Sequence, residues 1–269
     1  MKNVLSIAGS DSCGGAGIQA DLKTFSALGT YGMTVITAVT AQNTTGVFQV
    51  RELDGDIVQA QINCLFEDIA VSAVKIGMVS SIEVIAAIAD CLRKHKAGNI
   101  VVDPVMVSKS GCHLLRPESK NALIQNLFPL ATVVTPNLFE AEVITGDKID
   151  GIAAMEKAAL KIHELGAGNV IVKGGHLTGD AIDVVFDGKK LDHLKGKRIF
   201  TPNTHGTGCT FSSAIAAYLA KGYGAAEAIR KAKEYIHIAI ANSLPLGHGA
   251  GPTHHFYELY RKAGVVAVR

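Results

Sequence analysis

The sequence predicts an α/β fold in which helices cover both faces of a central, mostly parallel sheet. Six short apolar runs rich in β-branched residues recur along the chain, and segments with apolar residues at helical spacing lie between them. Strands of a parallel sheet are apolar on both faces because helices bury both, so this alternation favours a parallel sheet. The six runs are residues 4–8, 33–39, 73–77, 99–103, 132–135 and 169–173.

The segments between these runs carry the sequence signals of helices. Three of them show a stripe of apolar residues at helical spacing, which predicts a face packed on the sheet. Helix starts are also indicated, because Ser80 and Glu83 have the spacing of a capping box and Pro117 suits a first helical turn. The three stripes are Ile57-Ala60-Cys64-Leu65, Ile85-Ile88-Leu92 and Met155-Ala158-Ala159-Ile162.

The alternation of strands and helices changes after residue 180. Residues 181–201 contain two short strand-like runs around a DGKK turn, which predicts an antiparallel edge of the sheet. Two helices are then expected, over residues 207–222 and 225–242. No linker-like stretch or internal repeat interrupts the sequence, so we expect residues 1–269 to form a single domain.

Charge and composition exclude several classes of protein. The 269 residues carry 26 basic and 24 acidic side chains, and a net charge of +2 gives no general attraction to nucleic acid or anionic lipid. No run approaches the ~18 apolar residues of a membrane span. Five scattered cysteines without a CxxC pair argue against a disulfide framework or a zinc ribbon. We expect a cytoplasmic protein without membrane or nucleic-acid partners.

Residues of the type that binds ligands follow the predicted strands at six consecutive strand ends. Ligands of open α/β sheets bind outside the carboxyl ends of the strands, where these residues would meet. We therefore expect one site along a single edge of the sheet. The strand-end residues are Gly9-Ser10-Asp11, Gln42-Asn43, Gly77-Met78, Asp103-Pro104, Asn137 to Glu140, and Lys173-Gly174-Gly175.

The first strand end leads into a glycine-rich loop, residues 9–17. Such a loop either lets backbone amides approach a ligand or forms a plain tight turn. Residues 15–20 also fit the GxGxxA fingerprint of dinucleotide-binding proteins. That fingerprint requires an acidic residue ~20 positions later, yet residues 22–51 contain no Asp or Glu. The dinucleotide interpretation is therefore excluded.

The motif HGTGC, residues 205–209, opens a predicted helix and indicates an anion site. Its glycines leave main-chain N–H groups unpaired at the positive end of the helix dipole, where a transferring phosphoryl group would be stabilised. Cys209 lies in the first turn, which predicts a lowered thiol pKa and a thiolate able to abstract a proton or act as a nucleophile. Alternatively, Cys209 is a small residue that packs the start of the helix.

Four polar residues near the other strand ends, and Lys233 on a predicted helix, are further candidates for the site. Asn137 and Glu140, three apart, suit a water-mediated Mg²⁺ contact or a helix capping box. Asp103 faces the site from a strand end or is structural, and Lys173 is placed to meet phosphate. Lys233 lies on an apolar helix stripe, so its ammonium group either reaches solvent or meets a buried anion.

Two further segments carry weaker signals. Residues 106–115 are polar and follow a strand end, so they form either a lid over the phosphates or an ordinary connecting loop. His248, His254 and His255 lack the companion Cys or carboxylate spacing of a metal site, which favours a surface tail.

Eight stretches, in their order along the chain, carry a specific resemblance to a known family. They are AGSDSCGGAGIQADLKTFSALGTYGMTVITAVTAQNT (8–44), KIGM (75–78), DPVM (103–106), SGCHLL (110–115), TPNLFEA (135–141), VKGGH (172–176), NTHGTGCTFSSAIAA (203–217) and HGAGP (248–252). They resemble the hydroxymethylpyrimidine/phosphomethylpyrimidine kinases of thiamin biosynthesis, within the ribokinase-like superfamily. Because they extend over nearly the whole chain, together they are far more specific than one glycine pattern.

The resemblance implies a ribokinase-like three-layer α/β/α fold and a homodimer. It also implies the reaction, which is ATP- and Mg²⁺-dependent phosphorylation of 4-amino-5-hydroxymethyl-2-methylpyrimidine and then of its monophosphate to the diphosphate. Gln42 would hydrogen-bond the aminopyrimidine edge, since an amide both donates and accepts. The other substrate-binding positions that the resemblance implies are Gly9, Ala16, Asp21, Met78 and Val105.

The resemblance likewise implies the residues that serve the nucleotide. Gly206, Thr207, Gly208 and Cys209 would form the catalytic anion hole. The nucleotide- and phosphate-binding positions would be Asp103, Asn137, Glu140, Lys173 and Lys233, with Glu140 and Asp103 toward the metal. Sugar kinases of the superfamily usually have an aspartate base where this chain has Cys209, which argues against a sugar substrate and leaves the base open.

Three other functions compete with this interpretation. A pyridoxal or pyridoxine kinase would keep the fold and the phosphate site but change the ring pocket. A thiol enzyme, such as an acyl transferase, would use Cys209 as a covalent nucleophile with His205 as the only nearby base in the sequence. A protein that binds pyrimidine without catalysis would release no ADP.

Overall fold

The computed structural model describes residues 1–107, 114–175 and 180–266. In this part of the chain a nine-stranded sheet has the order β3-β2-β1-β4-β5-β6-β7-β8-β9. Strands from β2 through β7 pair in parallel, whereas β3 at one edge and β8 and β9 at the other are antiparallel. The strands are β1 Asn3–Asp11, β2 Tyr31–Asn43, β3 Gly46–Glu52, β4 Ala73–Ile76, β5 Ile100–Val102, β6 Val133–Val134, β7 Asn169–Val172, β8 Ala181–Phe186 and β9 Leu191–Gly196.

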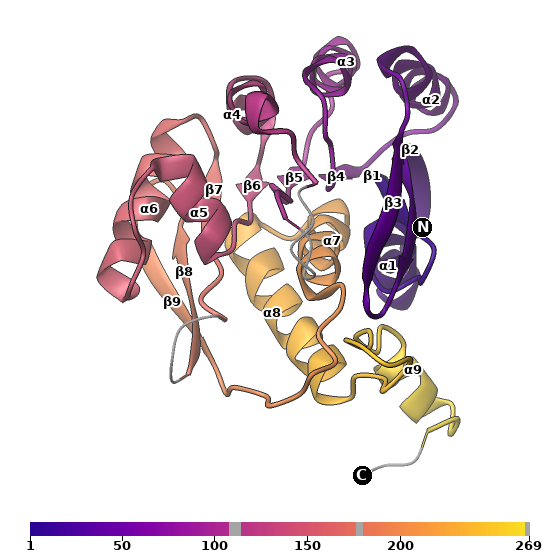
Figure 1. Ribbon diagram of the computed structural model, residues 1–269, viewed down its shortest axis with the longest axis vertical. Helices are drawn as coiled ribbons and strands as arrows, with labels where there is room; N and C mark the ends of the chain where they lie inside the picture. The colour runs from indigo at the N-terminus through magenta and orange to yellow at the C-terminus, as the bar shows by residue number, and fades with distance from the viewer. Residues whose placement is uncertain (108–113, 176–179, 267–269) are drawn as a thin grey trace.

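Helices cover both faces of this sheet, which confirms the predicted three-layer α/β/α architecture (Figure 1). On one face lie α2 to α6, over a large apolar cluster; α1, α7 and α8 pack over a second cluster on the other face. The helices are α1 Gly17–Ala27, α2 Gly55–Asp68, α3 Ile82–Lys94, α4 Lys120–Leu127, α5 Leu138–Thr145, α6 Ile152–Glu164, α7 Thr207–Ala220, α8 Ala225–Ala241 and α9 Tyr257–Lys262, with short 3₁₀ turns at Pro117–Ser119 and Phe128–Leu130.

The six predicted parallel strands and the antiparallel edge after residue 180 are confirmed, as are the two helices that follow. Strand β3 was not predicted. It pairs only with β2 at the edge, and its largest side chain, Phe48, is 70% exposed, so its sequence lacks the continuous apolar character of the central strands. Among the described helices, none is both long and apolar enough to cross a membrane.

Helices α2 and α3 differ from the prediction, α3 in its first residue and α2 in its buried face. The N-cap of α3 is Ser81, not Ser80, because the Ser81 side chain accepts from the N–H of Val84. Glu83 instead accepts from the N–H of Gly55 at the start of α2. The predicted stripe of α2 was also wrong, since Ile57 is exposed and the buried residues of that helix include Val58 and Ile62. The stripes of α3 and α6 are confirmed, and Pro117 begins a 3₁₀ turn that runs into α4.

Candidate functional site

A cleft of about 1360 Å³ opens at the carboxyl ends of the parallel strands, in front of the first turn of α7. It gathers residues from the beginning, the middle and the end of the chain, as the strand-end pattern predicts. Of the sequence-predicted site residues, it is lined by Gly9, Ala16, Gln42, Met78, Asp103, Val105, Asn137, Glu140, Lys173, Gly206, Thr207, Gly208, Cys209 and Lys233. Asp21 does not line it.

The first turn of α7 supplies main-chain donors to this cleft. Gly206 is the N-cap, in the left-handed region at φ +74°, and a Cβ atom there would lie 1.7 Å from the Gly15 carbonyl oxygen, so only glycine fits. Within the described residues, the N–H groups of Gly208 and Cys209 have no protein acceptor. Thr207 donates back to the Thr204 carbonyl. The free N–H groups and the helix dipole together suit an anion.

A cation and two carboxylates lie beside these donors. Lys173 Nζ donates to Asp103 Oδ1 at 3.0 Å, and both side chains are largely buried. A Cβ atom on Gly208 would lie 3.4 Å from Asp103 Oδ2 and 3.5 Å from Lys173 Nζ, so any side chain at this position would touch the ion pair. An anion held by the α7 amides would therefore also meet the Lys173 ammonium group.

Glu140 is the second carboxylate, and it caps a helix as well as lining the cleft. Asn137 and Glu140 form the predicted capping box at the start of α5, each side chain accepting from the other's main-chain N–H. Burial, with a contribution from the nearby Asp103 carboxylate, raises the pKa of Glu140 to about 7, against the opposing effect of Lys173. Two carboxylates thus share one ammonium group, an arrangement that favours an added cation.

The raised pKa of Glu140 makes the stability of the protein pH-dependent. The folded state holds the Glu140 proton more tightly than the unfolded state, so the free energy of unfolding should fall as the pH rises from about 4.5 to about 7. Glu140→Gln removes this dependence. Between pH 5 and pH 8, its stability relative to the wild type should improve by roughly 1–3 kcal/mol, measured by urea unfolding. Parallel pH profiles for the two proteins would contradict this, and Glu164→Gln, an exposed position on α6, is the control.

The predicted thiolate at Cys209 was wrong. Burial raises the pKa of the Cys209 thiol to about 11, and the Asp21 and Asp103 carboxylates reinforce this, while the Lys75 ammonium group opposes it only in part. The side chain still borders the cleft, but as a neutral thiol. The helix position alone suggested the opposite shift because the two carboxylates come from segments far away in the sequence.

Asp21 is a buried structural residue and not part of the cleft lining. It is fully buried and lies 2.9–3.0 Å from Lys75 Nζ, which is itself fully buried on β4. The hydroxyl groups of Ser6 and Ser213 donate to the same carboxylate, at 2.5 and 2.6 Å. Burial alone would lower the pKa of Lys75, but the nearby negative groups, Asp21 first and Asp103 with it, together outweigh burial and raise that pKa. The implied contact between Asp21 and a substrate is therefore corrected.

Lys233 reaches a buried anion, the second of the two possibilities that its position on an apolar stripe left open. Its Nζ donates to Asp183 Oδ2 at 2.5 Å, and the Asp183 side chain is only 7% exposed. Asp183 Oδ1 accepts from the N–H of Gly174, which follows β7. Asp183 was missed in the sequence because it lies inside the antiparallel strand β8, next to the edge strand β9, and not at a carboxyl end of the parallel strands.

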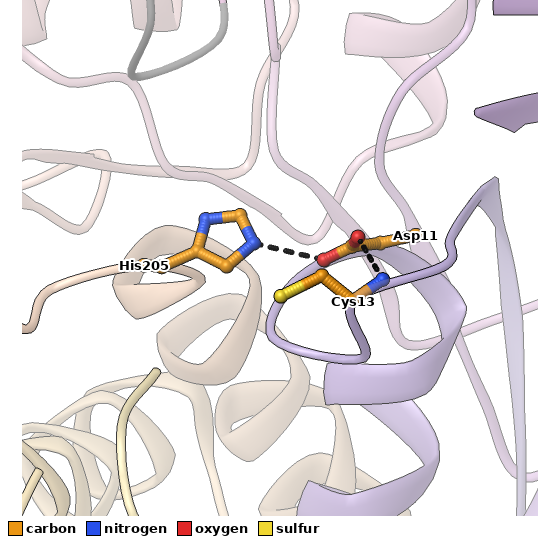
Figure 2. Close-up of side chains that lie close together, drawn as sticks. All are labelled: Asp11, Cys13 and His205. Atoms are coloured by element: carbon orange, nitrogen blue, oxygen red, sulfur yellow. Dashed lines mark hydrogen bonds and ion pairs between the residues drawn. The ribbon is translucent and has the colours of Figure 1, made fainter. Parts of the chain in front are cut away.

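The glycine-rich loop after β1 does not offer its amides to a ligand. Asp11 Oδ2 accepts from the N–H groups of Gly15 and Ala16. Its Oδ1 accepts from the N–H group of Cys13 (Figure 2). The same carboxylate also lies 2.8 Å from His205 Nε2. These hydrogen bonds outweigh burial and lower the pKa of Asp11. The loop is a turn organised by Asp11, and the sequence signal for it was the Asp that ends β1.

The C-terminal histidines and the proposed lid are the two remaining predictions about the site. His254 and His255 are buried, and His255 Nε2 lies 3.0 Å from Thr210 Oγ1, so the surface-tail interpretation was wrong for both; His248 is exposed. Burial lowers the pKa of His255 to about 3. Of the proposed lid, residues 108–113 lie outside the described residues.

Comparisons with known proteins span nearly the whole chain. The model of the phosphomethylpyrimidine kinase family matches residues 11–254. A hydroxymethylpyrimidine/phosphomethylpyrimidine kinase of Rhizobium meliloti is 58% identical over 261 residues, 96% of this chain and 98% of the relative. A Bacillus subtilis pyridoxal kinase, solved as an ADP complex, has a TM-score of 0.89 at 46% identity and covers 95% of this chain and 97% of its own. A Clostridium difficile phosphomethylpyrimidine kinase structure has a TM-score of 0.80 at 52% identity, covering 89% and 100%.

Proposed function

The chain belongs to the phosphomethylpyrimidine kinase family, and on that premise we propose that it transfers the γ-phosphoryl group of ATP to a pyrimidine alcohol. The acceptors are 4-amino-5-hydroxymethyl-2-methylpyrimidine and then its monophosphate, whose phosphorylation gives the diphosphate in thiamin biosynthesis. The enzyme is a phosphotransferase with the ribokinase-like fold. We further propose, from the family alone, that it acts as a cytoplasmic homodimer.

One observation carries this proposal: free main-chain donors at the start of α7 lie in the same cleft as Lys173 and Gln42. Phosphoryl transfer requires little covalent chemistry from a protein, and depends on in-line positioning and on charge stabilisation at the phosphate oxygens. The N–H groups of Gly208 and Cys209 and the Lys173 ammonium group supply that stabilisation. Gln42, at the end of β2, is placed to hold the ring whose hydroxyl group attacks.

The acidic residues of the cleft fit a magnesium ion. Asp103 and Glu140 are hard oxygen ligands beside the Lys173 ammonium group, and burial, reinforced by the Asp103 carboxylate, raises the pKa of Glu140. Mg²⁺ bound there would neutralise charge on the phosphate oxygens. Asn137 and Lys173 lie at the same strand ends, where a β-bridge joins them.

Cys209 contributes its main-chain N–H group to this chemistry, not a thiolate. With a pKa of about 11 its thiol stays protonated at neutral pH, so it cannot take the proton of the attacking hydroxyl group before transfer. The same property argues against the thiol-enzyme alternative, which also needs His205 as its base. The His205 ring nitrogen Nε2 faces Asp11 at 2.8 Å instead.

A pyridoxal kinase remains the second candidate, because the Bacillus subtilis pyridoxal kinase has a closely similar structure at 46% identity. The test is kcat/KM in a coupled ADP-release assay with the pyrimidine alcohol, its monophosphate, pyridoxal and pyridoxine. We expect the highest value for one of the two pyrimidines. A higher value for pyridoxal would reverse the assignment, and ADP release that does not depend on any acceptor would refute it.

A further inference from the structure

We propose that His205 is a positioning residue that fixes the amide of Gln42, with the amide oxygen toward His205 and the NH₂ group toward Thr40 and the substrate ring. The inference rests on the proposed function, in which Gln42 contacts the ring. Gln42 and His205 both line the cleft although 163 residues separate them in the sequence. Gln42 ends β2, and His205 immediately precedes the N-cap of α7.

The Asp11 carboxylate determines which atom of His205 carries a proton. It is 3% exposed and accepts three main-chain N–H groups, at 2.8–3.1 Å. These three donors need accepting oxygens on both sides of the carboxyl group, and so they stabilise its ionised form. An ionised carboxylate can only accept. The His205 Nε2 atom, 2.8 Å from Asp11 Oδ2, must therefore carry a proton and donate it (Figure 2).

Because His205 Nε2 carries a proton, only an acceptor atom of Gln42 can form a hydrogen bond with it. The Gln42 amide approaches His205 Nε2 at 3.3 Å through its nitrogen atom, so two donors face each other. At the other end of the amide, two acceptors face each other. The Thr40 hydroxyl has one proton, which it gives to the Ser10 carbonyl at 2.9 Å, so its lone pairs face the Gln42 oxygen at 3.4 Å.

A half-turn of the amide group resolves both conflicts without moving any other atom. The two ends of an amide have nearly the same shape, so hydrogen bonding decides which end points where. After the turn, Gln42 Oε1 lies 3.3 Å from His205 Nε2 and shares its one proton with Asp11 Oδ2, as the longer branch of a bifurcated hydrogen bond. The Gln42 NH₂ group donates to Thr40 Oγ1. One amide N–H and one lone pair of the amide oxygen remain for a ligand in the cleft.

The His205 ring is itself held in place from several sides. A Cβ atom on Gly15 would lie 2.2 Å from His205 Cδ2, so the glycine lets the ring pack directly on the loop. The His205 N–H donates to the Gly251 carbonyl at 3.0 Å, in the segment 248–252 whose role the reaction does not otherwise explain. Because the ring is fixed, the orientation it imposes on Gln42 is fixed as well.

The test is a double-mutant cycle on ring binding. The variants are Gln42→Ala, His205→Leu, His205→Gln and Gln42→Ala/His205→Leu; the readouts are the Kd of the pyrimidine alcohol, the KM for ATP and the melting temperature. We expect Gln42→Ala to raise the Kd by about 5- to 150-fold, and His205→Leu to raise it at least about 5-fold. His205→Gln keeps a side-chain donor and should stay within about 3-fold of the wild type.

The double variant separates a positioning role from a general structural one. If His205 acts through Gln42, then His205→Leu should raise the Kd by less than about 2-fold in the Gln42→Ala background, with the KM for ATP unchanged throughout. An equal loss in both backgrounds would overturn the proposal. If instead Gln42→Ala leaves the Kd unchanged while the wild type phosphorylates the alcohol, the ring contact of Gln42 fails, and the inference fails with it although the kinase assignment stands.

A measurement on the unaltered protein keeps the proposal testable if His205→Leu does not fold. A long-range ¹H–¹⁵N spectrum reports which ring nitrogen of a histidine carries a proton, and the spectrum of His205→Gln identifies the His205 signals by their absence. We expect a protonated Nε2 in the wild type. A bare Nε2 with a protonated Nδ1 would overturn the proposal, because Gln42 would then donate to His205 as it stands.

Discussion

Gly208→Asp is expected to lower kcat by at least about 1000-fold, because it places a carboxylate among the donors that we propose receive the transferring phosphoryl group. A side chain at this position starts 3.4 Å from Asp103 Oδ2 and 3.5 Å from Lys173 Nζ. The new carboxylate would compete with phosphate for Lys173 and would add to the charge of Asp103 and Glu140. Steady-state kinetics with the pyrimidine alcohol and ATP give the effect.

The matched control for this variant is Gly208→Asn, which has the same shape without the charge. Any loss of kcat caused by crowding should appear in both variants. The added charge should make the kcat of the aspartate variant at least about 10-fold lower than that of the asparagine variant. Melting temperatures show whether the fold survives in both. Normal turnover in Gly208→Asp would mean that the phosphoryl group is not held at the start of α7.

Lys75→Met is expected to lower the free energy of unfolding by about 3–5 kcal/mol, because it leaves the fully buried Asp21 carboxylate without its counter-ion. Only the hydroxyl groups of Ser6 and Ser213 would then donate to that carboxylate. Urea unfolding at neutral pH measures the loss. Replacing both partners, as Lys75→Met/Asp21→Asn, should recover a large part of it, since no unpaired charge stays buried.

An exposed ion pair provides the comparison for Lys75. Lys161 lies 3.1 Å from Asp147, and about half of each side chain or more is exposed. Lys161→Met should therefore cost less than about 1 kcal/mol. If Lys75→Met were as mild as Lys161→Met, the buried pair would contribute little to the fold, and the placement of Asp21 away from the substrate would need another explanation.

Much of the fold could be predicted because the strands and most helices are defined by local apolar patterns. The central strands are buried on both faces, so each appears as a continuous run, and the stripe of α3 from Ile85 to Leu92 matches its buried face. Strand β3 was not predicted, because an edge strand with an exposed Phe48 has no continuous apolar run. The predicted cap of α3, Ser80, and the observed cap, Ser81, are neighbours, and residue spacing alone does not distinguish them.

The sequence predicts where the site lies, but not the protonation states and ion-pair partners of its residues. The carboxyl ends of parallel strands meet whatever the details of the loops, so Gln42, Asp103, Asn137 and Lys173 come together as expected. The protonation state of the Cys209 thiol depends first on its burial and then on Asp21 and Asp103, and the tertiary fold sets all three. For the same reason no pattern in the sequence could show that Asp11 is bound to His205.

Helix α7 is buried along almost its entire length, between the sheet on one side and α1 and α8 on the other. A local opening of this helix would have to expose the apolar cluster beneath it, so its fluctuations are tied to those of the whole molecule. In the proposed function, the nucleotide would therefore meet a helix whose position is set before it arrives. Adaptation to different acceptor molecules would then come from the surrounding loops, while the geometry at the phosphorus atom would stay constant from one turnover to the next.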